Sequence, residues 1–127
     1  MYTVVHGALD DEQLMRHVDE LNRRTQGADD LREFADARGL ENMDALTVSG
    51  TTLAAAHEVP RLQSRLAILV TDSPLLIGLA RAYQAFAQNQ RGSVEIFQDE
   101  AAALEWLAEG RDDLPELQRF VADRRAS

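Results

Sequence analysis

A six-residue run, LAILVT at Leu66–Thr71, constrains the fold of this chain more than any other feature. It shows no alternation of polar and apolar residues, which is typical of a strand that is buried on both faces. Such a strand lies in the middle of a parallel sheet and needs helices packed on both sides. The run therefore predicts an α/β domain in which Leu66–Thr71 is a central strand.

Three further segments have the pattern of strands: Tyr2–His6, Leu31–Ala37 and Ser93–Phe97. In Leu31–Ala37 the alternation places Phe34 and Asp36 on one face and the odd-numbered residues on the other. In Ser93–Phe97 apolar residues alternate with polar ones, so we expect a half-exposed strand at or near a sheet edge. Helical segments separate these strands, which implies right-handed crossovers and a four-stranded, mixed or mostly parallel sheet.

Helix start signals stand in front of several periodic segments. Asp10 and Gln13 have the spacing of a capping box, and Ser73 precedes a proline that suits the first helical turn. Further helices are predicted to begin at Asp44, at Asp99 and after Asp112 or Asp113. The helix from Asp44 to Glu58 would place Leu46, Gly50 and Leu53 on one face.

The helix after Ser73 is predicted to run to about Gln90, with Gly92 closing it. Its broad apolar face comprises Leu75, Leu76, Leu79, Ala80, Tyr83, Phe86 and Ala87. Gly78 lies inside this helix, where glycine costs about 1 kcal/mol relative to alanine. We expect a compensating close approach, either of the helix to the sheet or of another chain to the helix.

Composition excludes several classes of function. The 127 residues, which we read as one domain over 1–127, carry 13 Lys plus Arg against 22 Asp plus Glu, a net charge of −9. Nucleic acid and anionic membranes are therefore poor partners. The chain has no cysteine and three scattered histidines, so we expect no metal and no cofactor. No apolar run approaches the roughly 20 residues that span a bilayer, and we expect a cytoplasmic protein.

Several motifs resemble the STAS, or SpoIIAA-like, family, in its uncharacterised bacterial branch. They are the Gly-Leu-Ala-Arg of Gly78–Arg81, the strand Val94–Phe97, the Ala-x-x-Trp-Leu from Ala103 to Leu107, and the segment FADARGLENMD at Phe34–Asp44. The resemblance covers about four-fifths of the chain, and it implies a STAS-like fold and a regulatory, non-enzymatic role. Family members usually begin with a strand hairpin, whereas this chain starts at what looks like the second strand of that pair. An edge that another chain could cover by pairing is therefore expected.

The phosphorylated serine of the anti-sigma-factor antagonists in this family is absent here. It would follow Asp44, where this chain has Ala45 and Leu46. Thr47 and Ser49 are the nearest hydroxyls and are the candidate phosphoacceptors. Phosphorylation would add about −1.5 to −2 charge, which is unfavourable on an acidic face.

Candidate binding residues gather where the predicted strands end. Asp72 and Ser73 follow the central strand, at the place where open parallel sheets bind ligands, although helix capping alone accounts for Ser73. Asp36 ends the strand before it, and Arg38 is expected to pair with Asp36 or Asp72 and lower the carboxyl pKa. Arg81 would have a packed stem and a head in water that is able to pair with a partner.

The most probable function from these residues is a non-enzymatic regulatory or protein-interaction module, with a homodimer as its simplest form. The alternative is a small-molecule or lipid-like ligand carrier, with an apolar pocket lined by Leu69, Leu76 or Phe86. A hydrolase using Ser73 is a weaker alternative, because no G-x-S-x-G elbow surrounds the serine. No catalytic residue is assigned.

Overall fold

The strand predicted from LAILVT lies in the interior of the sheet. A computed structural model describes residues 2–6, 10–24, 30–39, 47–56, 61–88 and 91–126. In it β3 (Arg61–Leu69) begins five residues before the predicted strand and ends two before its predicted end. Residues 66–70 are all buried, and the Val70 amide still donates to the Phe97 carbonyl at 2.8 Å. The expectation of a central strand covered on both faces is confirmed.

The sheet has four parallel strands in chain order. On one side β3 pairs with β2 (Arg32–Asp36), which in turn pairs with β1 (Tyr2–His6). On the other side β3 pairs with β4 (Arg91–Phe97), so the strand order is β1-β2-β3-β4. Every adjacent pair is parallel, with a register shift between β3 and β4 near their first residues. The expectation of a four-stranded, mostly parallel sheet is confirmed, and β4 is an edge strand as its alternation indicated.

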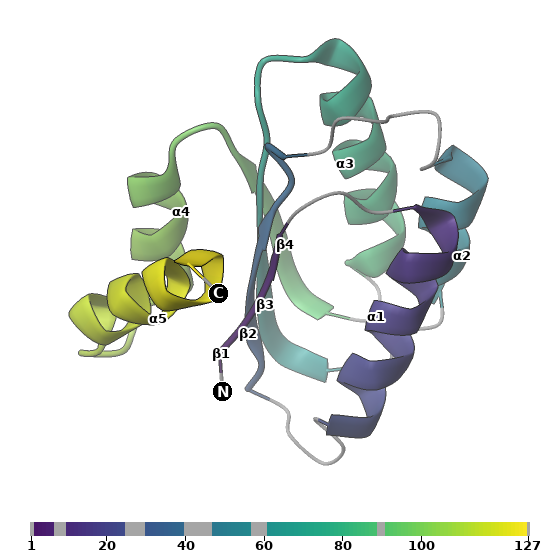
Figure 1. The fold of residues 1–127 in the computed structure, drawn as a ribbon. Coiled ribbons are helices and arrows are strands. Elements are labelled where there is room, and N and C mark those ends of the chain that lie inside the picture. The colour runs from purple at the N-terminus through teal and green to yellow at the C-terminus, as the bar shows by residue number, and fades with distance from the viewer. Residues whose placement is uncertain are drawn as a thin grey trace.

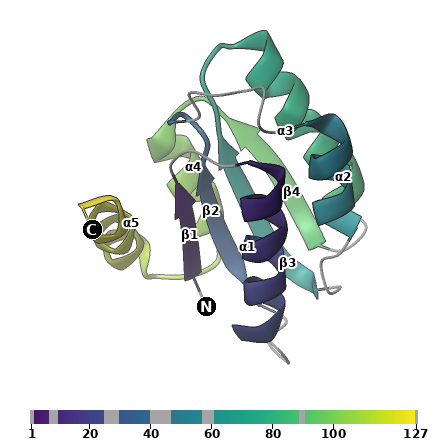
Figure 2. The same ribbon diagram turned by 45° about the vertical axis from the view of Figure 1, so that its right-hand side comes forward.

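Helices cover both faces of the sheet (Figures 1 and 2). α1 (Asp11–Arg24), α2 (Val48–Ala56) and α3 (Pro74–Ala87) lie on one face. They are the crossovers between consecutive strands, and crossovers of one hand that advance in one direction stay on one side of the sheet. α4 (Glu100–Leu107) and α5 (Leu114–Ala126) follow the last strand and pack on the opposite face. No helix among the residues described is long and apolar enough to cross a membrane.

The two faces of the sheet bury separate apolar clusters. On the α3 side Leu66 and Ile68 of β3, together with Val70 just after the strand, pack with residues of α2, α3 and β4. On the other side Phe34, Ala67 and Leu69 pack against α4 and α5. The alternation of β3 thus supplies both cores, which explains why the buried part of the run, Leu66–Val70, contains no polar residue.

Three predicted helix starts have the expected caps. The Asp10 amide donates to the Gln13 side chain at 3.0 Å, and the Gln13 amide donates to Asp10 at 2.7 Å, which completes the capping box. Ser73 accepts from the Leu76 amide at 3.3 Å and Asp99 accepts from the Ala101 amide at 3.2 Å. These side chains satisfy amides that have no partner within the helix.

The predicted face of α2 is wrong. Leu53 is 56% exposed, whereas Thr51, Ala54 and Ala55 are buried. α2 begins after Thr47, and Asp44 and Leu46 lie outside the described residues. Gly50 faces Asp11 of α1 so closely that a Cβ would overlap the carboxyl group. The helix therefore turns its small residues toward α1 and the sheet, and its leucine outward.

The predicted face of α3 is correct for Leu76, Leu79, Ala80 and Ala87, which are buried. It is wrong for Leu75 and Phe86, which are 59% and 51% exposed. Among the residues that the structure describes, and apart from the neighbouring backbone of its own helix, no atom lies within 4 Å of a Cβ built at Gly78, so the predicted close approach to the sheet is wrong as well. Gly92 belongs to β4 and does not close the helix.

Candidate functional site

Two of the predicted site residues, Asp36 and Arg38, meet at the carboxyl end of β2. Arg38 donates from Nε and Nη2 to the two carboxylate oxygens of Asp36, at 3.0 and 2.9 Å, in a bidentate pair. Its Nη2 also lies 3.3 Å from Glu100, the first residue of α4. The hydrogen bond that Arg38 donates to Asp36 is the main cause that raises the pKa of Arg38. The expected pairing is present, and it ties the end of β2 to the start of α4.

Asp72 and Ser73 form the turn between β3 and α3. The Ser73 hydroxyl oxygen accepts from Leu76, and the Ser73 amide donates to the Thr71 hydroxyl at 3.2 Å. Asp72 is exposed. The arrangement is that of a helix N-cap, which is the structural interpretation that the sequence offered for Ser73.

The candidate phosphoacceptors lie at the start of α2. Thr47 donates from its hydroxyl and its amide to the two oxygens of Asp11, at 2.6 and 2.8 Å, and so joins α2 to α1. Ser49 is exposed. A phosphate on Thr47 would face the Asp11 carboxylate and disrupt this contact by charge repulsion.

A charged cluster missed by sequence reasoning lies under α1. Glu33 on β2 pairs with Arg91 at the start of β4 at 2.8 Å, and the two side chains are 3% and 0% exposed. Glu33 also contacts His17 Nε2 of α1 at 2.8 Å and accepts from the Thr3 hydroxyl at 3.3 Å. Burial raises the pKa of Glu33, but Arg91 and His17 outweigh it and hold the pKa at about 2.

The cluster borders a groove of about 160 Å³ beside β1. The groove is lined by Tyr2, Thr3 and Val4 of β1, and by side chains of α1 and α5. Pockets that enclose small organic molecules are usually about 300–1,000 Å³, so this open groove does not enclose such a ligand. The carrier hypothesis named other residues, and those are not together either: Leu69 and Leu76 lie in opposite cores and Phe86 is exposed.

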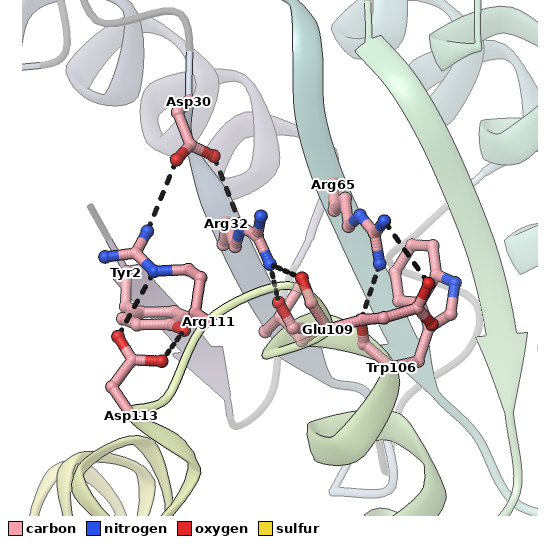
Figure 3. Close-up of polar contacts among 9 residues, drawn as sticks. Tyr2, Asp30, Arg32, Arg65, Trp106, Glu109, Arg111 and Asp113 are labelled. Carbon is pink, nitrogen blue, oxygen red and sulfur yellow. Dashed lines mark hydrogen bonds and ion pairs between the residues drawn. The ribbon is translucent and has the colours of Figure 1, made fainter.

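A network of arginines and aromatic rings lies at the end of α4 (Figure 3). Arg32 donates to the carbonyls of Leu107 and Glu109 at 2.6 and 2.8 Å, and Arg65 donates to that of Trp106 at 2.8 Å while lying over its ring. The Trp106 and Leu107 carbonyls belong to the last turn of α4 and the Glu109 carbonyl follows it, at the end of the helix where positive charge is favoured. Both arginines therefore hold α4 against the sheet.

The same network holds α5 to β1 (Figure 3). Tyr2 donates to Asp113 at 2.7 Å, and Arg111 lies over the Tyr2 ring while contacting Asp30 and Asp113 at 3.4 and 3.2 Å. Burial, followed by the hydrogen bond to Asp113, raises the pKa of Tyr2 to about 12. We interpret the whole network as structural, because it fixes α4 to the sheet and α5 to β1.

α2 and α3 present the least charged surface of the structure. The nine residues of α2 carry no charged side chain and the 14 of α3 carry only Arg81, which is exposed. At about 100° per residue, one sector of α3 contains five residues that share an apolar character and are exposed or half-exposed: Leu75, Gly78, Ala82, Ala85 and Phe86. We call these five residues the α3 face.

Comparisons with models of protein families, with curated proteins and with solved structures give no significant match. The described residues contain no group of three His, Asp or Glu side chains placed to hold a metal ion. The functional argument therefore rests on the surfaces of the molecule.

Sequence reasoning missed Glu33 and Arg91 because they are 58 residues apart and are separated in the sheet by β3. One sequence feature could have indicated the ion pair. Glu33 shares one face of its strand with the apolar residues Leu31 and Ala35, and a carboxylate buried among apolar side chains needs a buried cation. Leu75 and Phe86 of the α3 face were assigned to the predicted apolar face because they are apolar. Periodicity does not separate two apolar sectors of one helix.

Proposed function

We propose that this chain is a non-enzymatic protein-interaction module, and that the α3 face binds a second copy of the chain. The single observation that carries the proposal is the exposure of Leu75 and Phe86, at 59% and 51%, on a helix with one charged residue. In a chain with 28% charged residues, an apolar helix surface of this kind is a common mark of a protein–protein contact.

The order of side chains along the α3 face favours a second copy as the partner. Large residues stand at both ends, Leu75 and Phe86, and small residues, Gly78 and Ala82, stand between them. If two copies of α3 cross antiparallel about a two-fold axis, Leu75 of each copy lies near Phe86 of the other. The small residues then meet at the centre and let the helices approach closely. An isologous interface requires such a self-complementary pattern.

Arg81 lies outside this sector, about 120° from Leu75 around the helix axis. Two copies would therefore not bring their Arg81 side chains face to face. The guanidinium stays at the rim, where it is able to pair with a carboxylate of the other copy at little cost in desolvation.

A STAS-like fold is part of the same proposal. It is supported by the Gly-Leu-Ala-Arg motif of Gly78–Arg81, by the strand Val94–Phe97, and by a four-stranded sheet packed with helices. A regulatory role would use Thr47, whose phosphorylation would separate α2 from α1 beside the α3 face.

The proposal is tested by sedimentation equilibrium of the wild-type chain and of a Leu75→Glu, Phe86→Glu double variant. Both side chains are exposed, so the double variant should fold. We expect a concentration-dependent dimer for the wild type and at least a tenfold weaker association for the variant. Leu53→Glu is the matched control, because Leu53 is 56% exposed on the neighbouring helix and lies outside the α3 face. A wild-type monomer at all concentrations, or equal weakening by the control, would refute the proposal.

A further inference from the structure

The groove beside β1 runs along the open edge of the sheet. Consecutive side chains of a strand point to opposite faces. Thr3 points toward α1, where it contacts Glu33, whereas Tyr2 and Val4 pack on the α5 side. A groove lined by all three residues therefore straddles the outer edge of β1 and reaches its backbone. β1 is the terminal strand, and no strand of the described chain pairs with this edge.

At the opposite edge of the sheet, a side chain covers one outward backbone carbonyl. The Phe97 carbonyl of β4 accepts from Val70, so it points toward β3. Since backbone groups alternate along a strand, the Val94 carbonyl points away from β3. The Gln84 side chain of α3 donates to this carbonyl at 2.7 Å. The β4 edge thus has one of its outward carbonyls bonded to a side chain, whereas the β1 edge faces a groove.

The walls of the groove determine which kind of partner fits. Leu21 and Arg24 of α1 stand on one side of β1, and Phe120 and Arg124 of α5 stand on the other. A second copy that paired through β1 would have to place its own α1 and α5 beside these two walls. A single extended segment lies about 4.8 Å from the strand that it joins and carries no such layers. The groove therefore suits one strand.

The charges of the groove determine the chemistry of that strand. Arg24 and Arg124 line opposite walls, and Glu20 is the one acidic side chain in the lining. This balance is positive, whereas the chain as a whole has a net charge of −9. Complementary potentials select partners and speed their association.

We propose that an acidic, extended segment of a partner protein adds to the sheet as a fifth strand in the groove between α1 and α5, pairing with β1. Main-chain hydrogen bonds to β1 supply affinity, and Arg24 and Arg124 supply selection for carboxylates. This inference concerns a second surface and does not depend on association through the α3 face.

The test uses a phage-displayed library of random peptides, selected on the full chain, followed by synthesis of the strongest binder. We expect selected peptides rich in Asp, Glu and strand-forming residues. The synthetic peptide should slow amide hydrogen exchange in Tyr2–His6 and leave Arg91–Phe97 unchanged. Selection of basic or helical peptides, a failure to select any, or binding without protection of Tyr2–His6 would overturn the proposal.

A charge-reversal pair of variants sharpens the test. Arg24→Glu with Arg124→Glu should weaken the peptide at least tenfold. The matched control is Arg23→Glu with Arg119→Glu, which makes the same change in net charge on the same two helices at exposed positions outside the groove. Equal weakening by both pairs would show that only the overall charge matters. The Leu75→Glu, Phe86→Glu double variant should leave peptide binding intact. Its effect therefore distinguishes a failure of dimerisation through the α3 face from a failure of strand addition at β1.

Discussion

Glu33 and Arg91 form an ion pair at 2.8 Å across the width of β3, with both side chains withdrawn from solvent. Their burial removes the hydration of two charges, so each depends on the other and on the hydrogen bonds around it. The pair joins β2 to the first residue of β4, the edge strand. His17 extends the contact to α1.

The first prediction follows from this dependence. Arg91→Met should lower the free energy of unfolding by about 3–5 kcal/mol, because it leaves the Glu33 carboxylate buried without its cation. Urea denaturation followed by circular dichroism measures the change. The double variant Arg91→Met, Glu33→Gln should recover much of the loss, since no buried charge remains. A loss below about 1 kcal/mol in the single variant would contradict the argument.

The same pair makes stability depend on pH in a defined window. The pKa of Glu33 is about 2 in the folded chain and 4.5 for the unperturbed group. Because the folded value is the lower one, this stabilisation is fully present above the unperturbed pKa and is lost as the pH falls toward 2. The free energy of unfolding should therefore fall less steeply between about pH 5 and pH 3 in Glu33→Gln than in the wild type. Identical slopes would exclude a role for Glu33.

Local signals in the sequence predicted much of the fold. The LAILVT run placed β3, the spacing of Asp10 and Gln13 placed the start of α1, and Ser73 with Pro74 placed the start of α3. Each of these sequence patterns lies within a few residues of the strand or helix end that it determines. Arg38 was predicted to pair with Asp36 or Asp72, and the pair that forms is the one with Asp36, two residues away.

Contacts between distant segments were not predictable in the same way. The pairing of Glu33 with Arg91 requires the strand order and the register, which no local pattern encodes. The exposure of Leu53, Leu75 and Phe86 depends on how each helix is rotated against the sheet. Gly50 shows why that rotation was missed for α2: the contact that orients it comes from Asp11 on another helix. The groove beside β1 likewise forms only when α1 and α5 take their places on opposite faces.

The N-cap of α3 supports a third prediction. Ser73→Ala should destabilise the fold by about 1 kcal/mol, because the Leu76 amide loses its acceptor. Ser73→Asp should retain most of the stability, since aspartate caps equally well. Thermal unfolding of the two variants distinguishes them. Equal stability of the wild type and Ser73→Ala would show that the hydrogen bond contributes nothing.

A substitution at Gly78 should affect the stability of the monomer and its self-association in opposite directions. In the described part of the chain a methyl group at this position meets no atom within 4 Å outside the nearby backbone of α3, so Gly78→Ala should raise the free energy of unfolding by up to about 1 kcal/mol through helix propensity alone. The proposed dimer brings Gly78 against the α3 helix of the other copy, where the same methyl group would hold the helices apart. We therefore expect a more stable monomer and a weaker dimer from one substitution, measured by denaturation of the dilute protein and by sedimentation. Ala85→Gly, at an exposed position near the rim of the α3 face, is the control for propensity and should destabilise the monomer by a similar amount. If Gly78→Ala stabilises the monomer and leaves association unchanged, α3 does not meet its copy at Gly78.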